Sequence, residues 1–192
     1  MAKNPKDGKL LYHLTALDNL LSIFEKGLLP RNNINFKFKD VADDEILKDR
    51  KKFALGDHTP FHFFCPSPFA GAAQNANLDT EFVYITVSRE LAEYHKFKII
   101  PSHPLHFHEE PLEWGEGIEK IDWELMSRRD YSNHLCKETC MAESLFNGHI
   151  KIEHFHTIFV RNGEVQSNVL NLLKEMELKV RVTINASMFI KK

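Results

Sequence analysis

The sequence lacks any long apolar run, and none approaches the roughly 20 residues that a helix needs to cross a bilayer. It also has few cysteines, since its 192 residues contain only Cys65, Cys136 and Cys140. An odd number of cysteines without a disulfide pattern is typical of a reducing compartment. The first eight residues lack the apolar segment of a secretory signal peptide. These absences predict a cytoplasmic protein with no membrane-spanning segment.

An excess of charge of one sign is missing as well. The formal net charge is −2, so nucleic-acid binding would depend on local basic patches rather than on overall charge. Hydrophobic residues make up 43% and charged residues 27% of the chain, which is ordinary for a globular protein. No repeat or low-complexity tract divides the chain. At this length we expect one domain that spans residues 1–192.

Hydrophobic periodicity predicts short strands with few helices between them. Strands are expected at residues 9–15, 59–65, 81–88, 97–100, 155–160 and 179–184, with a further strand headed by Glu143. Helices are expected from residue 16 onward, over residues 41–53, 122–126 and 163–173, and as short turns after Pro68 and Ser88. Residues 101–121 and 128–141 show no clear period. Because regular helices do not separate the strands, the pattern indicates an α+β fold rather than a doubly wound sheet.

The spacing of histidines and cysteines does not favour a metal site or a cysteine nucleophile. Eleven histidines are scattered along the chain. The pairs His106-x-His108 and His154-x-His156 could chelate a metal from one face of a strand, but zinc sites usually show tighter paired spacing. We therefore expect no metal. No cysteine lies at a helix N-terminus or in a known local signature, which argues against Cys–His catalysis.

Two stretches far apart in the chain suggest a single site. Tyr12-His13-Leu14-Thr15 lies on the first predicted strand, and Ala142-Glu143 opens a later one. Each residue also has a structural explanation. His13 suits a core histidine, Thr15 suits a helix cap with Asp18 three residues on, and Glu143 suits an exposed edge charge. The residues taken singly leave both interpretations open.

A series of motifs in fixed order points to the functional interpretation. It contains the Tyr-His-x-Thr strand, a helix ending in Gly27-Leu28, an arginine-containing second helix, Pro60-Phe61-His62-Phe63 with a Pro-Ser-Pro end, Ile121-Asp122-Trp123, and Ala142-Glu143. From about Leu10 to the C-terminus, this series resembles the DarT-type ADP-ribosyltransferase toxins, which modify bases in DNA. The resemblance implies a compact ADP-ribosyltransferase fold, with two small splayed β-sheets and NAD in the cleft between them. It also implies single-stranded DNA as substrate and a macrodomain-type antitoxin as partner.

The resemblance implies roles for individual residues of the cofactor site. His13, Leu14 and Thr15 match the positions that hold the nicotinamide end of NAD, and Ser22 falls where the first helix faces the dinucleotide. Arg50 matches the catalytic arginine that orients NAD near its phosphates. Basic residues at the end of that helix also suit the helix dipole without any ligand. Glu143 matches the catalytic glutamate.

The resemblance places substrate recognition in the segment before Glu143. Residues Trp123 to Met141 match the recognition loop. Within it, Arg128 and Arg129 could contact nucleic acid and Tyr131 or Trp123 could stack on an unpaired base, although each basic residue also suits an ordinary surface position. Lys37, Lys39, Lys51 and Lys52 offer a second basic rim. Two departures concern the target: the segment from Cys136 to Met141 is less basic than in many members, and Cys65-Pro66-Ser67-Pro68 lacks the arginine that many members carry there.

The expected chemistry accounts for the residue types. The bond between ribose C1′ and nicotinamide breaks through an oxocarbenium-like state, whose positive charge a carboxylate can stabilise. Glu143 can also accept a hydrogen bond from the ribose 2′-hydroxyl and take a proton from the nucleophile. We therefore expect an NAD-dependent ADP-ribosyltransferase that modifies a nucleobase in single-stranded DNA, as the toxin of a toxin–antitoxin or phage-defence system. The alternatives are transfer to RNA or protein, or a catalytically silent binding module.

Overall fold

The computed structural model describes residues 4–41 and 55–191. Its strands are β1 (Leu10–Ala16), β2 (His58–His62), β3 (Phe82–Ser88), β4 (Lys98–Ile100), β5 (Glu143–Asn147), β6 (Thr157–Val160) and β7 (Val182–Ile184). Its α-helices are α1 (Leu20–Lys26), α3 (Pro68–Ala76), α4 (Arg89–Tyr94), α5 (Trp114–Lys120), α6 (Trp123–Arg128), α7 (His134–Thr139) and α8 (Gly163–Glu175). The predicted α+β class is confirmed. Arg50 and the helix predicted for residues 41–53 lie outside the described residues, apart from residue 41.

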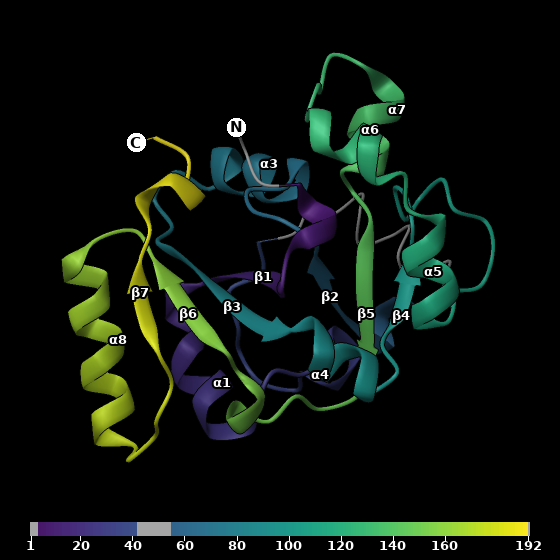
Figure 1. Cartoon of the computed structure of the whole chain (residues 1–192). Coiled ribbons are helices and arrows are strands. Elements are labelled where there is room, and N and C mark those ends of the chain that lie inside the picture. Colours follow the sequence, from purple (N-terminus) through teal and green to yellow (C-terminus); the bar gives the residue numbers. More distant parts are fainter. Residues whose placement is uncertain (1–3, 42–54, 192) are drawn as a thin grey trace.

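The strands form one mixed sheet in the order β4-β5-β2-β1-β3-β6-β7. β1 pairs with β3 along its whole length, and β2 pairs with β5 along its whole length. By contrast, β1 and β2 pair at a single position, Tyr12 opposite His62. The two small sheets expected from the sequence are therefore the two halves of one sheet, β4-β5-β2 and β1-β3-β6-β7, joined at this one pair. The two halves diverge from this junction (Figure 1).

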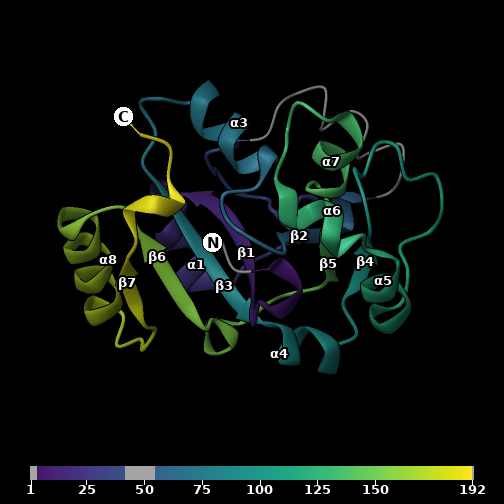
Figure 2. The same ribbon diagram turned by 45° about the horizontal axis from the view of Figure 1, so that its top comes forward.

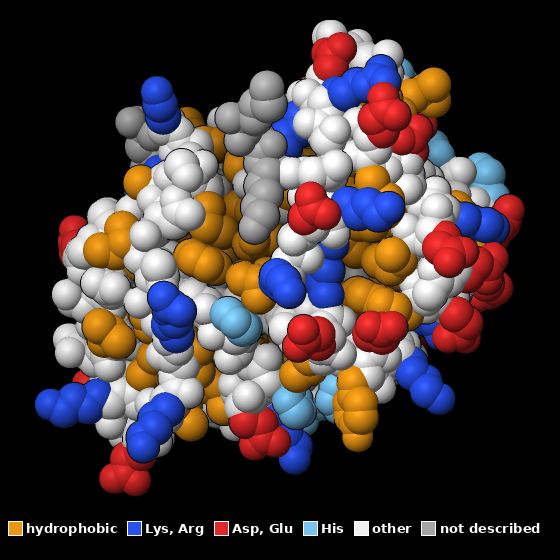
Figure 3. Space-filling model, viewed as in Figure 1, with side chains coloured by type: hydrophobic (Ala, Val, Ile, Leu, Met, Phe, Trp, Pro, Cys, Tyr) orange, Lys and Arg blue, Asp and Glu red, His pale blue; other side chains and the backbone are white. Residues whose placement is uncertain are grey.

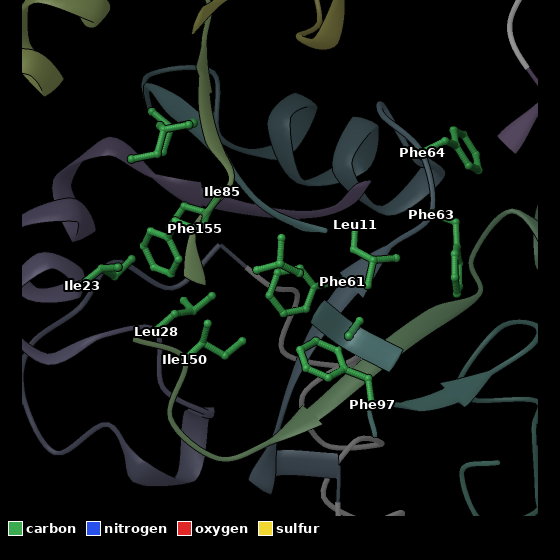
Figure 4. Close-up of a cluster of buried hydrophobic side chains, with 14 of the residues drawn as sticks. Leu11, Ile23, Leu28, Phe61, Phe63, Phe64, Ile85, Phe97, Ile150 and Phe155 are labelled. Carbon is green, nitrogen blue, oxygen red and sulfur yellow. The ribbon is translucent and has the colours of Figure 1, made fainter. Parts of the chain in front are cut away.

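Helices cover the sheet unevenly. α8 and α1 pack together beside β6 and β7, while α5 lies against β4 (Figures 1 and 2). α6 and α7 form a lobe at the end of β5 from which the strand begins, and we call residues Trp123–Thr139 the α6–α7 lobe. The main core contains Leu11, Phe61 and Ile85 from three different strands together with Phe97, which directly precedes β4, and all four are buried (Figure 4). No helix of the described ranges is long and apolar enough to cross a membrane.

Most element boundaries follow the local sequence signals. Ser88 caps α4 by accepting a hydrogen bond from the Leu91 amide, and Asp122 caps α6 through the Leu125 amide. Gly27 ends α1 with a positive φ of 75°, as a glycine at a helix C-terminus commonly does. The expected cap at Thr15 is wrong, because Thr15 lies inside β1 and its hydroxyl accepts a hydrogen bond from Asn19 instead.

Two helices were not expected from the sequence. α7 is one and a half turns long and begins at Asn133, whose side chain accepts a hydrogen bond from the Cys136 amide at 2.9 Å. α5 contains two glycines, Gly115 and Gly117, which weaken any helical signal. Gly117 is required by packing, since a Cβ there would lie 2.3 Å from Cβ of Ile99 in β4. Tertiary contact with the sheet thus specifies a helix where local propensity does not.

Candidate active site

Glu143 is the first residue of β5 and is 5% exposed. It lies opposite His62 of β2 on one side and opposite Ile100 of β4 on the other. The chain reaches this position through a tight turn after α7, in which the Met141 and Ala142 amides donate to the carbonyls of Glu138 and Thr139. A carboxylate placed between two paired strands is held by the backbone of three strands rather than by a loop.

His62 contacts the backbone next to Glu143. Its Nδ1 lies 3.2 Å from the carbonyl oxygen of Ala142, and its ring lies 5.4 Å from that of Phe69. A carbonyl oxygen can only accept a hydrogen bond, so Nδ1 of His62 carries the proton and donates it. The residue is 5% exposed. His62 therefore fixes the backbone from which the Glu143 side chain projects, a role that the sequence alone did not indicate.

His13 joins the two halves of the sheet. It lies on β1, and its Nδ1 donates to the carbonyl oxygen of Pro60 in β2 at 2.9 Å. Its ring packs 5.5 Å from the ring of Phe61. Because Nδ1 is the donor, Nε2 of the neutral ring is a hydrogen-bond acceptor. The structure thus supplies the neighbour that fixes the tautomer of His13, as a cofactor-binding neutral histidine requires.

Asn19 ties the segment after α1 to the first strand. Its side-chain amide donates to the Thr15 hydroxyl at 3.1 Å and to the Lys39 carbonyl at 2.9 Å, and it accepts from the Lys39 amide at 2.7 Å. Asn19 is 7% exposed and Thr15 is 6% exposed. The signal in the sequence was a polar residue one helical turn after Thr15, in the middle of the apolar run from Leu17 to Phe24.

These residues surround one cleft. Its cavity volume is about 180 Å³, below the roughly 300–1,000 Å³ of typical small-molecule sites. Five of the predicted site residues line it: His13, Leu14, Thr15, Ser22 and Glu143. Asn19, His58, His62 and His103 also line it, although the sequence did not single them out.

The segment from Arg31 to Val41 forms an aromatic wall of the cleft. Ile34, Phe36 and Phe38 line it. Lys26 lies over the Phe36 ring at 4.0 Å, while Arg31 lies 5.5 Å from the Phe38 ring and pairs with Asp40. Apolar and aromatic walls with a few polar groups are typical of sites that bind a nucleotide cofactor.

The predicted nucleic-acid contacts lie apart from the cleft, in the α6–α7 lobe. Arg128 is exposed and pairs with Glu124 at 2.9 Å, and Tyr131 is 42% exposed. Arg129 has a positive φ of 51°, and its guanidinium lies 4.7 Å from the centre of the Phe64 ring. None of the three lines the cleft. Arg129 therefore also anchors the lobe to the main body, whereas Arg128 and Tyr131 face outward.

Charges of both signs are intermixed on the surface. On the face drawn in Figure 3, Lys and Arg side chains alternate with Asp and Glu, and no basic area extends across several elements. Within the described ranges, no three His, Cys, Asp or Glu residues are arranged to hold a metal ion. Burial raises the pKa of Cys65 and of Cys140 to about 12, so neither thiol is a nucleophile at neutral pH.

Comparisons with solved structures identify the fold as that of an ADP-ribosyltransferase. The structure matches Thermus sp. 2.9 DarT in complex with ADP-ribosylated ssDNA with a TM-score of 0.85, at 23% identity, over 99% of this chain and all of that one. It matches Thermus sp. 2.9 DarT in complex with NAD+ with a TM-score of 0.78, at 21% identity, over 96% and 98% of the two chains. Thermosipho africanus DarTG in complex with ADP-ribose gives 0.66 at 20% identity, over 94% of this chain and 51% of that one.

The sequence itself identifies the protein family. Residues 12–190 match the family described as "ssDNA thymidine ADP-ribosyltransferase, DarT". A sequence comparison with curated proteins finds no match. The chain belongs to the DarT family, and the enzyme class expected from the motif series is confirmed.

Proposed function

We propose that this protein transfers ADP-ribose from NAD to thymine in single-stranded DNA. The observation that carries the proposal is Glu143, buried at the head of β5 in the same cleft as His13 and Thr15. Membership of the DarT family supports both the donor and the acceptor.

Binding of the donor is assigned to the β1 side of the cleft. His13 presents Nε2 as an acceptor, which suits the amide protons of the nicotinamide carboxamide. The Leu14 backbone and the Thr15 hydroxyl lie next to it on the same strand, and Ser22 lies on α1 across the cleft. The aromatic wall from Ile34 to Phe38 covers the apolar surface of the dinucleotide. Arg50 remains the predicted phosphate ligand and lies outside the described residues.

Glu143 carries the chemical step. The C1′–N bond to nicotinamide breaks and neutral nicotinamide leaves with the bonding electron pair, while positive charge develops on the ribose. The Glu143 carboxylate stabilises this charge. A bond then forms between C1′ and N3 of thymine, and the N3 proton passes to Glu143. An unpaired base presents N3, which is covered in a duplex, so a single strand is the appropriate substrate.

The α6–α7 lobe is the proposed contact for the DNA strand. It precedes Glu143 directly in the chain and presents Arg128 and Tyr131 to solvent. Arginine suits the phosphates and an exposed tyrosine suits stacking on an unpaired base. Arg129 contributes charge from beside the Phe64 ring.

Uncontrolled modification of DNA would be toxic, so we propose that the protein acts as the toxin of a toxin–antitoxin or phage-defence system. The likeness to Thermosipho africanus DarTG, whose chain is about twice the matched length, supports an antitoxin partner of the macrodomain type. We place the activity in the cytoplasm, where NAD and DNA are both available, and the three free cysteines agree with a reducing compartment.

The test is to incubate the protein with labelled NAD and separate pools of single-stranded DNA, double-stranded DNA, RNA and protein. We expect label on single-stranded DNA that contains thymine, and none with Glu143→Gln. Labelling of RNA or protein in place of DNA would assign a different acceptor. No labelling of any pool, with NAD bound, would indicate a silent binding module.

A further inference from the structure

His103 lines the same cleft as Glu143, and its position in the sequence did not indicate a role. It follows β4 by three residues, and the last residue of β4, Ile100, pairs with Glu143. Three residues extend at most about 10 Å, and the charge of Glu143 reaches His103, since it acts to raise the pKa of that ring. Both side chains line the cleft.

A backbone contact fixes the tautomer of His103. The Leu105 amide donates a hydrogen bond to its Nδ1 at 3.2 Å. Nδ1 is therefore unprotonated, and the neutral ring carries its proton on Nε2. Burial and the neighbouring His106 lower the pKa of His103, against the opposing effect of Glu143 and Glu138. The ring is thus neutral at neutral pH and is a hydrogen-bond donor at Nε2.

The ring is also held in place by stacking. His106 lies on it with ring centres 4.8 Å apart and an interplanar angle of 29°. His106 in turn contacts the Glu138 carboxylate of α7 through Nδ1. His103 is thereby fixed between the loop after β4 and the α6–α7 lobe, which is the arrangement expected of a preorganised donor.

We propose that His103 is a specificity-determining residue, whose Nε2–H donates to a carbonyl oxygen beside N3 of the target thymine. This inference rests on the proposed function and extends it. The imide edge of thymine offers an N–H between two carbonyl oxygens. Glu143 accepts from the N–H and His103 donates to a carbonyl, so the two side chains together match that edge.

The same pair rejects cytosine. Cytosine has no proton on N3, so acceptor would face acceptor at Glu143. Cytosine also carries an amino group where thymine has O4, so with His103 at position 4 donor would face donor as well. His103 also assists the reaction on thymine. When N3 gives up its proton, negative charge spreads to the neighbouring oxygens, and the Nε2–H bond strengthens.

His103→Asn tests the inference because it keeps the acceptor function of Nδ1 and removes the donor function of Nε2. The Asn side-chain oxygen can accept the Leu105 amide, as in an Asx-turn, whereas no group replaces Nε2–H. His103→Gln is the complementary variant, since its amide can donate at the position of Nε2. His108→Asn is the matched control on the same loop, because His108 is exposed and does not line the cleft.

The measurement is transfer to oligonucleotides with a single thymine or a single cytosine, followed by mass spectrometry, alongside hydrolysis of NAD to free ADP-ribose. We expect His103→Asn to lower the ratio of thymine transfer to NAD hydrolysis on the order of 10- to 100-fold. His103→Gln should recover part of this ratio, and His108→Asn should equal the wild type. Thermal unfolding checks that all three variants are folded.

Two results separate this inference from the function on which it rests. If the wild type transfers ADP-ribose to thymine and His103→Asn keeps the wild-type ratio, the inference is overturned and the proposed function stands. A parallel fall of transfer and hydrolysis in His103→Asn also overturns it, since His103 would then support the NAD site. If the wild type modifies no thymine oligonucleotide, the proposed function fails together with the inference.

Discussion

The two glycines of α5 make a matched pair for testing how the sheet specifies this helix. Both lie in Trp114–Lys120, two residues apart. A Cβ on Gly115 would meet nothing within 4 Å, whereas a Cβ on Gly117 would lie 2.3 Å from Cβ and 2.8 Å from Cγ2 of Ile99. Ile99 is fully shielded from solvent in β4, so it has no free space into which to move.

The two substitutions are therefore expected to change stability in opposite directions. Replacing a glycine by alanine in a helix gains roughly 0.5–1 kcal/mol from the lower backbone entropy of the unfolded chain. Gly115→Ala should raise the free energy of unfolding by about this amount. Gly117→Ala gains the same term but also forces an extra carbon into a packed core, which typically costs about 1–3 kcal/mol. Its net effect should be a loss of roughly 0–2 kcal/mol.

Urea denaturation of the wild type and the two variants measures both changes. The informative quantity is the difference between Gly117→Ala and Gly115→Ala, because the propensity term cancels and about 1–3 kcal/mol of overpacking remains. Gly117→Ala should also lower transferase activity, since β4 pairs with the strand that begins at Glu143. Equal stability of the two variants would refute the close approach of α5 to Ile99 on which the reasoning rests.

Four further predictions concern the cleft and the α6–α7 lobe. Glu143→Gln should keep the fold and lower the rate of transfer by on the order of 10²-fold or more, and near wild-type turnover would remove Glu143 from the catalytic role. Arg50→Ala should weaken NAD binding in calorimetry more than it weakens DNA binding. An unchanged NAD affinity would favour the alternative interpretation, in which Arg50 only stabilises the helix dipole. Arg128→Ala should make the log–log salt dependence of single-stranded DNA binding shallower by roughly 0.7 per lost phosphate contact. Arg129→Ala should in addition lower thermal stability, because its guanidinium packs on Phe64, and equal unfolding temperatures for the two arginine variants would contradict that difference.

The sequence predicted those parts of the structure that depend on local signals. Hydrophobic periodicity identified the strands around Tyr12 and Val83, and the helices predicted after Ser88 and over residues 122–126 are present as α4 and α6. The cofactor-side residues and Glu143 were placed in one site through their motif order, and the structure brings them to one cleft. Arg50 lies outside the described residues, so its role remains a prediction.

The parts that were missed depend on contacts between distant segments. The helical state of α5 follows from Gly117 against Ile99, and no local pattern encodes that approach. His62 acquires its role from register, because it lies opposite Glu143 and contacts the Ala142 carbonyl 80 residues along the chain. His103 looked like one of many scattered histidines until pairing of β4 with β5 brought it beside the carboxylate.

The proposed active site takes its residues from both halves of the sheet, which are joined by a single residue pair between β1 and β2. The groups assigned to NAD are carried by β1 and α1, and the reacting carboxylate is carried by β5, which is anchored on β2. Between these halves, the described strands meet at Tyr12 and His62, and His13 adds a side-chain bond to Pro60. In the proposed function, the distance from the NAD ribose to the Glu143 carboxylate is set at this junction. A substitution of Tyr12, which pairs with His62 but does not line the cleft, would therefore alter that distance without removing a proposed substrate contact.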